Sequence, residues 1–108
     1  MKITNKKKLV CIITTFEIEE KANRFANLLL QKQLAACVSI KEIRSSYLWK
    51  GSIEKNNEFQ LLIKSLDDKL EDVISFIRSS HDYEVPEIIF WLVEASEEYL
   101  DWIKNEIN

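Results

Sequence analysis

Apolar and polar residues alternate along the chain in blocks that predict four strands and three helices. Residues Leu9–Thr15 form a short, mostly apolar and β-branched run, which is typical of a central strand. Thr14 or Thr15 is expected to cap a helix that continues to about residue 32, because apolar residues there recur at helical spacing. The chain therefore begins with a strand followed by a helix.

Two long strands joined by a tight turn are predicted next. The first runs from Leu34 to Trp49, and Lys50-Gly51 forms the turn, since glycine adopts positive φ without steric cost. The second returns over residues 53–63, and the polar pair Asn56-Asn57 suggests a bulge within it. Both strands are longer than usual, so their tips should project beyond the core and need a partner.

The last third of the chain predicts a helix, a strand and a closing helix. Ser65 is expected to open a helix that ends near Ser79-Ser80, Ile88–Val93 is a strand that is apolar on both faces, and Ser96 caps the final helix. The order β-α-β-β-α-β with an extra C-terminal helix predicts an α+β, ferredoxin-like fold. In this fold an antiparallel sheet carries two helices on one face.

Composition places this fold in one domain over residues 1–108, with a polar N-terminal tail over residues 1–8. Hydrophobic residues make up 46% of the chain and charged residues 31%, as in ordinary globular proteins. The net charge of −3 gives no electrostatic reason to bind nucleic acid. We expect no membrane span and no secretory signal. Two cysteines without such a signal favour free thiols and a cytoplasmic location.

Five short strings, in the expected order and on the expected elements, carry a resemblance to one family. They are Leu34-Ala35-Ala36-Cys37, Tyr47-x-Trp49-x-Gly51, Leu62-Ile63-Lys64, Tyr83-Glu84-Val85-Pro86-Glu87-Ile88 and Tyr99-Leu100-Asp101-Trp102. The chain resembles the CutA family of divalent-cation tolerance proteins over about residues 9–103. The resemblance implies a ferredoxin-like homotrimer whose long hairpins pair across subunits, and tolerance to copper and other divalent metals without a catalytic reaction.

The segment 81–87 is the candidate metal site. Imidazole is a common transition-metal ligand, so His81 is the first expected ligand, and Glu84 and Glu87 offer oxygen atoms nearby. The alternative interpretation is structural: Pro86 enforces an extended entry into the last strand, and His81 caps the preceding helix. The spacing of these residues matches no standard chelating motif, so both interpretations stay open.

Three positions depart from the pattern that the resemblance implies. Ser80 stands where some members have a second histidine, Asp82 stands where many have proline, and Thr14 stands near the position of a proposed cysteine ligand. A Cys-His-His copper site is therefore incomplete in this chain. Any bound metal should use His81 with carboxylates or with groups from a neighbouring subunit.

The remaining candidates are one cysteine and three aromatic residues. Cys37 offers a thiolate for Cu(I) or for nucleophilic attack, but a small buried residue beside two alanines is the favoured interpretation. Tyr47, Trp49 and Trp102 are expected in subunit contacts, where large amphipathic rings contribute most of the binding energy.

The leading prediction is a non-enzymatic, CutA-like homotrimer that acts in tolerance to copper or another divalent cation. The alternative is a structural or regulatory trimer that binds a small anion or a protein partner, with metal incidental. The residues considered for the anion are Arg24, Arg44, Lys64 and Arg78. An esterase- or phosphatase-like enzyme has the least support, because the sequence offers no oxyanion-hole motif.

Overall fold

A computed structural model describes residues 7–107, and its elements follow the predicted order. They are β1 (Leu9–Phe16), α1 (Glu19–Gln31), β2 (Cys37–Trp49), β3 (Ser52–Leu66), a 3₁₀ turn (Asp67–Lys69), α2 (Leu70–Ser80), β4 (Ile89–Val93) and α3 (Glu97–Ile107). The strands form one antiparallel sheet in the order β2-β3-β1-β4. The predicted ferredoxin-like fold with an extra C-terminal helix is therefore confirmed.

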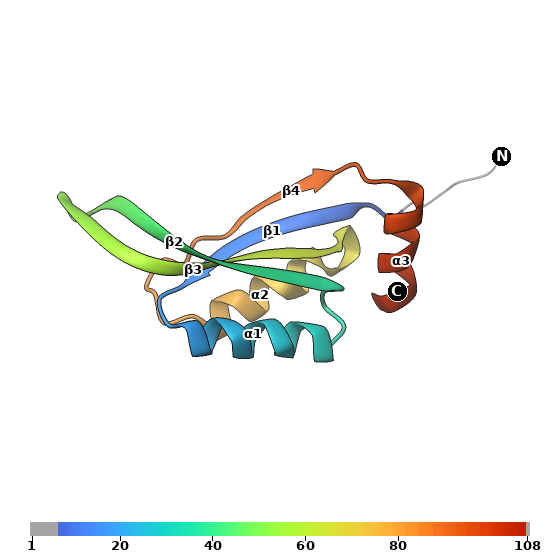
Figure 1. Cartoon of the computed structure of the whole chain (residues 1–108), viewed down its shortest axis with the longest axis horizontal. Helices are drawn as coiled ribbons and strands as arrows, with labels where there is room; N and C mark the ends of the chain where they lie inside the picture. The colour runs from blue at the N-terminus through green and yellow to red at the C-terminus, as the bar shows by residue number, and fades with distance from the viewer. Residues whose placement is uncertain (1–6, 108) are drawn as a thin grey trace.

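Helices α1 and α2 cover one face of the sheet, as Figure 1 shows. The core between them is built from alternate residues of the strands, because successive side chains of a strand point to opposite faces. Val10 and Ile12 of β1, Leu61 and Ile63 of β3 and Leu29 of α1 are all fully buried there. This arrangement holds the central strands rigidly at the end where the predicted metal segment begins.

Helix α3 closes the opposite end of the sheet. Ile103 and Ile107 pack on Leu9 and Leu66, where β1 begins and β3 ends, in a second small hydrophobic cluster. Ser96 Oγ accepts a hydrogen bond from the Tyr99 amide at 3.2 Å, so the predicted cap of this helix is confirmed.

Two other predicted helix caps are wrong. Thr14 and Thr15 lie within β1, and α1 begins four residues after Thr15, where the Ile18 backbone carbonyl accepts the first hydrogen bonds. Ser65 lies within β3, and its hydroxyl donates to the Leu34 carbonyl at 2.6 Å. In both cases pairing in the central sheet extends a strand through residues that would cap a helix elsewhere.

The β2–β3 hairpin is longer than the sheet that supports it. Its 13 and 15 residues pair without interruption from Cys37–Lys64 to Trp49–Ser52, so the predicted bulge at Asn56-Asn57 is wrong. Lys50 and Gly51 form the turn with φ of 52° and 83°. The tip projects far beyond the helices (Figure 1), which accounts for the 57 Å length of the molecule.

The last two residues of the polar N-terminal stretch form polar contacts with the folded domain. The Lys8 carbonyl accepts a hydrogen bond from the Asp67 amide at 2.9 Å, and Lys7 forms an ion pair with Asp68 at 3.3 Å. Lys7 and Lys8 therefore contact the 3₁₀ turn that precedes α2. The rest of the predicted tail, residues 1–6, lies outside the described residues.

Candidate functional site

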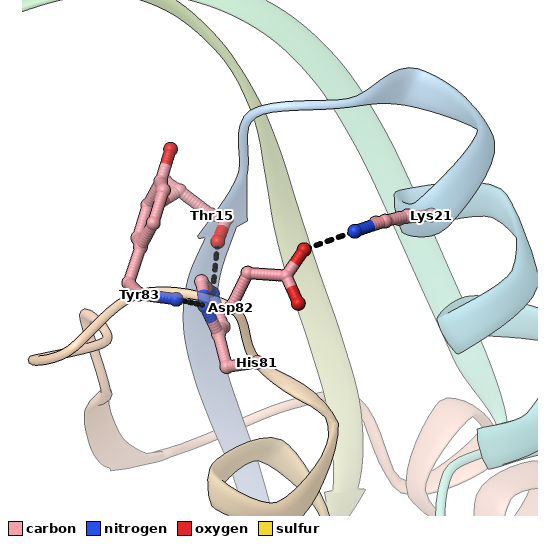
Figure 2. A network of polar contacts seen from close by, with 5 residues as sticks. All are labelled: Thr15, Lys21, His81, Asp82 and Tyr83. Atoms are coloured by element: carbon pink, nitrogen blue, oxygen red, sulfur yellow. Dashed lines mark hydrogen bonds and ion pairs between the residues drawn. The ribbon is translucent and has the colours of Figure 1, made fainter.

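His81 joins the end of α2 to the end of β1. Its Nε2 contacts the Thr15 carbonyl, and its Nδ1 accepts a hydrogen bond from the Tyr83 amide at 3.1 Å (Figure 2). A carbonyl oxygen only accepts, so Nε2 carries the proton and donates it, and the ring is the neutral tautomer. Both ring nitrogens are therefore engaged within the chain, which leaves neither with a free lone pair for a metal.

Aromatic contacts hold the same ring on both sides. The His81 ring stacks on Phe16 with centroids 4.5 Å apart and lies tilted against Tyr83 at 4.7 Å. His81 occupies the C-cap position of α2 with extended backbone, but its ring bonds to β1 and to its own segment. The predicted position of His81 at the cap of α2 is therefore confirmed, and its ring also anchors the segment 81–87 to the sheet.

Asp82 attaches the segment to α1. Its carboxylate pairs with the Lys21 ammonium, on the side of His81 away from Tyr83 (Figure 2). The hydrogen bond and the charge of Lys21 hold the pKa of Asp82 below its usual range. Asp82, which stands where the resemblance leads us to expect proline, thus has an ion-pair partner on α1.

Beyond Asp82, the segment and the hairpin enclose a cavity of about 650 Å³. Its walls come from the end of β1, from both strands of the hairpin and from the segment that leads into β4. The lining residues are Thr15, Arg44, Ser45, Ser46, Tyr47, Trp49, Glu54, Glu58, Tyr83, Glu84, Val85 and Glu87. Its size lies in the range of small-molecule sites, and four carboxylates face one guanidinium across it.

Glu58 is the most buried of these carboxylates. It is only 6% exposed, and it accepts a hydrogen bond from the Tyr83 hydroxyl at 2.9 Å. Burial and this hydrogen bond raise the pKa of Tyr83 far above its ordinary value, so the phenol stays a donor. Desolvation and the negative charge of Glu58 also raise the pKa of Glu87. The cavity therefore concentrates negative charge that its own residues do not neutralise.

The three predicted metal ligands are divided between two places. Glu84 and Glu87 line the large cavity, whereas His81 lines a smaller neighbouring pocket with Phe16 and Lys21. Within residues 7–107, no three side chains of histidine, cysteine, aspartate or glutamate lie close enough together to hold a metal ion. The described residues of one chain therefore do not bring the three predicted ligands together.

The positions discussed for sulfur ligands lie away from this cavity. Thr14 is fully buried and its hydroxyl has no hydrogen-bond partner among the described residues. Cys11 is buried and Cys37 is half-buried, and both flank Lys64 in the sheet. Burial raises the pKa of the Cys11 thiol. Cys37 is therefore less enclosed than predicted, and neither cysteine faces the predicted metal ligands.

The predicted interface aromatics Tyr47, Trp49 and Trp102 are all exposed in the single chain. Tyr47 and Trp49 also line the large cavity, whereas Trp102 lies on α3. The sequence analysis missed Glu54 and Glu58 altogether. A usable signal was present, because Glu58 directly precedes the mostly apolar stretch 59–63 of a central strand.

Comparisons with known proteins point to one family. The family model for the CutA1 divalent ion tolerance protein matches residues 10–106. The divalent-cation tolerance protein CutA of Thermotoga maritima is 35% identical over 100 residues, which cover 92% of this chain and 99% of the relative. The human protein CutA is 40% identical over 89 residues, 81% of this chain and 50% of that protein.

Solved structures of similar proteins share the fold. The periplasmic divalent cation tolerance protein CutA of Archaeoglobus fulgidus gives a TM-score of 0.89 at 36% identity, covering 93% of this chain and 99% of that one. CutA of Synechococcus elongatus gives 0.90 at 31% identity, covering 97% and 95%. Over residues 7–107, each helix is too short or too polar to cross a membrane. The chain belongs to the CutA1 divalent ion tolerance protein family.

Proposed function

We propose that this chain acts in divalent-cation tolerance as a cytoplasmic, non-enzymatic homotrimer that binds copper or another divalent cation near a subunit boundary. Membership of the family supports the general role, and the relatives from Thermotoga and Archaeoglobus are named for the same role. The observation that carries the binding proposal is the set of four carboxylates around the large cavity, which outnumber the one guanidinium that lines it and form no ion pair within residues 7–107.

The assembly is supported by apolar surface that one chain cannot cover. Leu48 and Ile53 at the hairpin tip are 74% and 71% exposed, and the edge strand β4 exposes Phe90, Trp91 and Leu92. A long apolar edge strand is an aggregation hazard unless another chain covers it. A closed ring of three chains covers such edges, because one patch of each chain meets a different patch of its neighbour, and Tyr47, Trp49 and Trp102 are suitable anchors.

The proposed ligands from this chain are Glu84, Glu87 and His81, which differ in whether their donor atoms are free to bind a cation. The two carboxylates face the cavity, and the two ion pairs among residues 7–107 involve neither of them. His81 binds a cation only after it releases the Thr15 carbonyl or the Tyr83 amide. We therefore expect the carboxylates to contribute most, with a neighbouring subunit completing the shell. A bound cation would supply charge neutralisation for Glu58 and Glu87.

Calorimetric titration of the native assembly with Cu²⁺ tests this proposal, with native mass measurement to count the chains. Glu84→Gln and Glu87→Gln should each weaken binding about tenfold, the usual loss for one charged ligand contact. Glu42→Gln, on the exposed part of β2 outside the cavity, is the matched control and should bind as the parent does. Equal affinity for all variants, or a stable monomer, would refute the proposal.

The anion-binding alternative has weaker support from the charges. Of the four basic residues considered for it, only Arg44 lines the large cavity, and it does so beside four glutamates. Lys64 lies on the sheet with its ammonium 5.8 Å from the centre of the Tyr99 ring. A titration with inorganic phosphate in place of copper separates the two functions on the same protein.

A further inference from the structure

The large cavity has a further feature, which binding of a bare metal ion does not require: two of its carboxylates are spread along one strand. Along β3, side chains at alternate positions share one face, so Glu54, Asn56 and Glu58 point the same way. The Cα atoms of the two glutamates lie roughly 13 Å apart, because a strand rises 3.3 Å per residue. The cavity thus places carboxylates at two separated points along one wall.

Aromatic rings lie between and beside these two carboxylates. Tyr47 lies directly across the hairpin from Glu54, and its hydroxyl is held by the Asn56 side-chain amide at 2.5 Å. Trp49 follows on the same face of β2, and Tyr83 closes the far end where it donates to Glu58. Ring faces attract ammonium groups, and the alkyl parts of a ligand pack on the same rings.

The burial of Glu58 supports cation binding independently of the number of acidic residues around the cavity. The residue is only 6% exposed, yet among the described residues its carboxylate accepts a single side-chain hydrogen bond, from the neutral phenol of Tyr83. The ion pairs among the described residues are Lys7–Asp68 and Lys21–Asp82, so neither neutralises it. A buried carboxylate without a cationic partner is costly, and it points to a cation that arrives from outside.

We propose that this cavity binds an extended aliphatic polyamine, with one ammonium group at Glu58, another at Glu54 and the carbon chain across the Tyr47 ring. The volume of about 650 Å³ accommodates such a ligand. A primary ammonium group offers three donors, which suits carboxylates that have unused acceptor capacity. The inference goes beyond the proposed metal function, because it rests on Glu54, Glu58 and the rings and not on His81, Glu84 or Glu87.

The test is calorimetric titration of the metal-free native assembly with spermidine, an extended triamine. Butylamine, with one ammonium group, and diacetylated spermidine, which lacks both terminal charges, serve as matched ligands. We expect one spermidine per chain and at least tenfold weaker binding of both matched ligands, because each lacks a charge-assisted contact. Equal affinity for spermidine and its diacetylated form would overturn the proposal.

Variants locate the site. Glu58→Gln and Glu54→Gln should each weaken spermidine binding about tenfold, and Glu54→Gln should leave butylamine binding at Glu58 unchanged. Glu42→Gln removes one exposed charge outside the cavity and should leave affinity unchanged. If it weakens binding as much as Glu58→Gln does, the attraction is general to an acidic protein and the proposal fails. Circular dichroism and native mass spectra confirm that each variant folds and assembles.

The result is independent of the metal function. Copper affinity is measured in parallel on the same variants and on Glu84→Gln. Glu84→Gln should weaken copper binding strongly. It should weaken spermidine binding less than Glu58→Gln does. Loss of copper binding with retained spermidine binding supports the polyamine site alone. Spermidine binding that disappears in Glu84→Gln but persists in Glu58→Gln contradicts the assignment made here.

Discussion

The two halves of strand β3 differ in how far they are buried. In its C-terminal half, Leu61, Ile63 and Leu66 are fully buried. Its N-terminal half runs out into the hairpin, where Ile53 is 71% exposed and Glu54 lines a cavity. One end of the sheet is thus completed by the chain itself, and the other end presents apolar and acidic surface for partners and ligands.

The largest expected effect compares the same residue type in these two halves. Ile63→Ala should lower the free energy of unfolding by about 3–4 kcal/mol, because it removes a fully buried side chain and leaves a cavity. Ile53→Ala, on the same strand, should change the stability of the folded chain by less than about 0.5 kcal/mol. Urea denaturation at low protein concentration measures both. Similar losses would show that the hairpin end belongs to the core of the single chain.

The second prediction concerns assembly at the exposed end. Trp49→Ala should weaken subunit association by about 2 kcal/mol, the usual size of an aromatic anchor at an interface. Sedimentation velocity over a dilution series measures the shift towards smaller species. Lys41→Ala, an exposed change nearer the sheet, is the control. Trimers that persist for Trp49→Ala at every dilution would exclude this ring as an anchor.

His81→Ala tests the contacts that hold the segment 81–87 against β1. The change removes the contacts with the Thr15 carbonyl, the Tyr83 amide and the Phe16 ring, so we expect a loss of about 2 kcal/mol. Hydrogen exchange at the Tyr83 amide should accelerate, because its acceptor is gone. Ser80→Ala, one residue earlier and exposed, should change neither quantity. An unchanged Tyr83 amide would contradict the anchoring role.

Thr14→Val probes the helix-covered face and should raise stability by about 1 kcal/mol. The side chain is fully buried, its hydroxyl has no partner among the described residues, and valine has nearly the same shape. Thermal unfolding measures the gain. Thr15→Val, at the cavity wall, is the comparison. A loss of stability in Thr14→Val would mean that the hydroxyl does find a partner.

The smallest effect is a pH dependence from Glu87. Its pKa is raised in the folded protein, so the folded state binds a proton there more readily than the unfolded state, and ionisation at neutral pH destabilises the fold slightly. This destabilisation disappears as the pH falls from neutral to below the ordinary glutamate value of 4.5, because the group is then protonated in both states. Glu87→Gln should therefore raise Tm slightly at pH 7 and leave it unchanged at pH 3.5. An equal rise at both values would assign the effect to packing.

Local pattern was enough to predict most of the fold. The apolar runs of β1 and β4 and the helical spacing in α1 and α2 each reflect one buried face, which a sequence states directly. The predictions failed where a residue was compatible with two structures. Thr15 and Ser65 are good helix caps, but pairing with neighbouring strands keeps both in the sheet, and that pairing joins residues far apart in the chain.

The sequence by itself determined the element order, the long hairpin and the family, and it predicted a functional role for the segment 81–87. Only the tertiary structure decided how that segment is used. It directs the His81 ring inward to Thr15, separates it from Glu84 and Glu87, and brings Tyr83 to Glu58, which lies 25 residues earlier. The reason is physical: hydrogen bonds and burial depend on distances in space, and spacing along the chain does not report them when the partners lie on different strands.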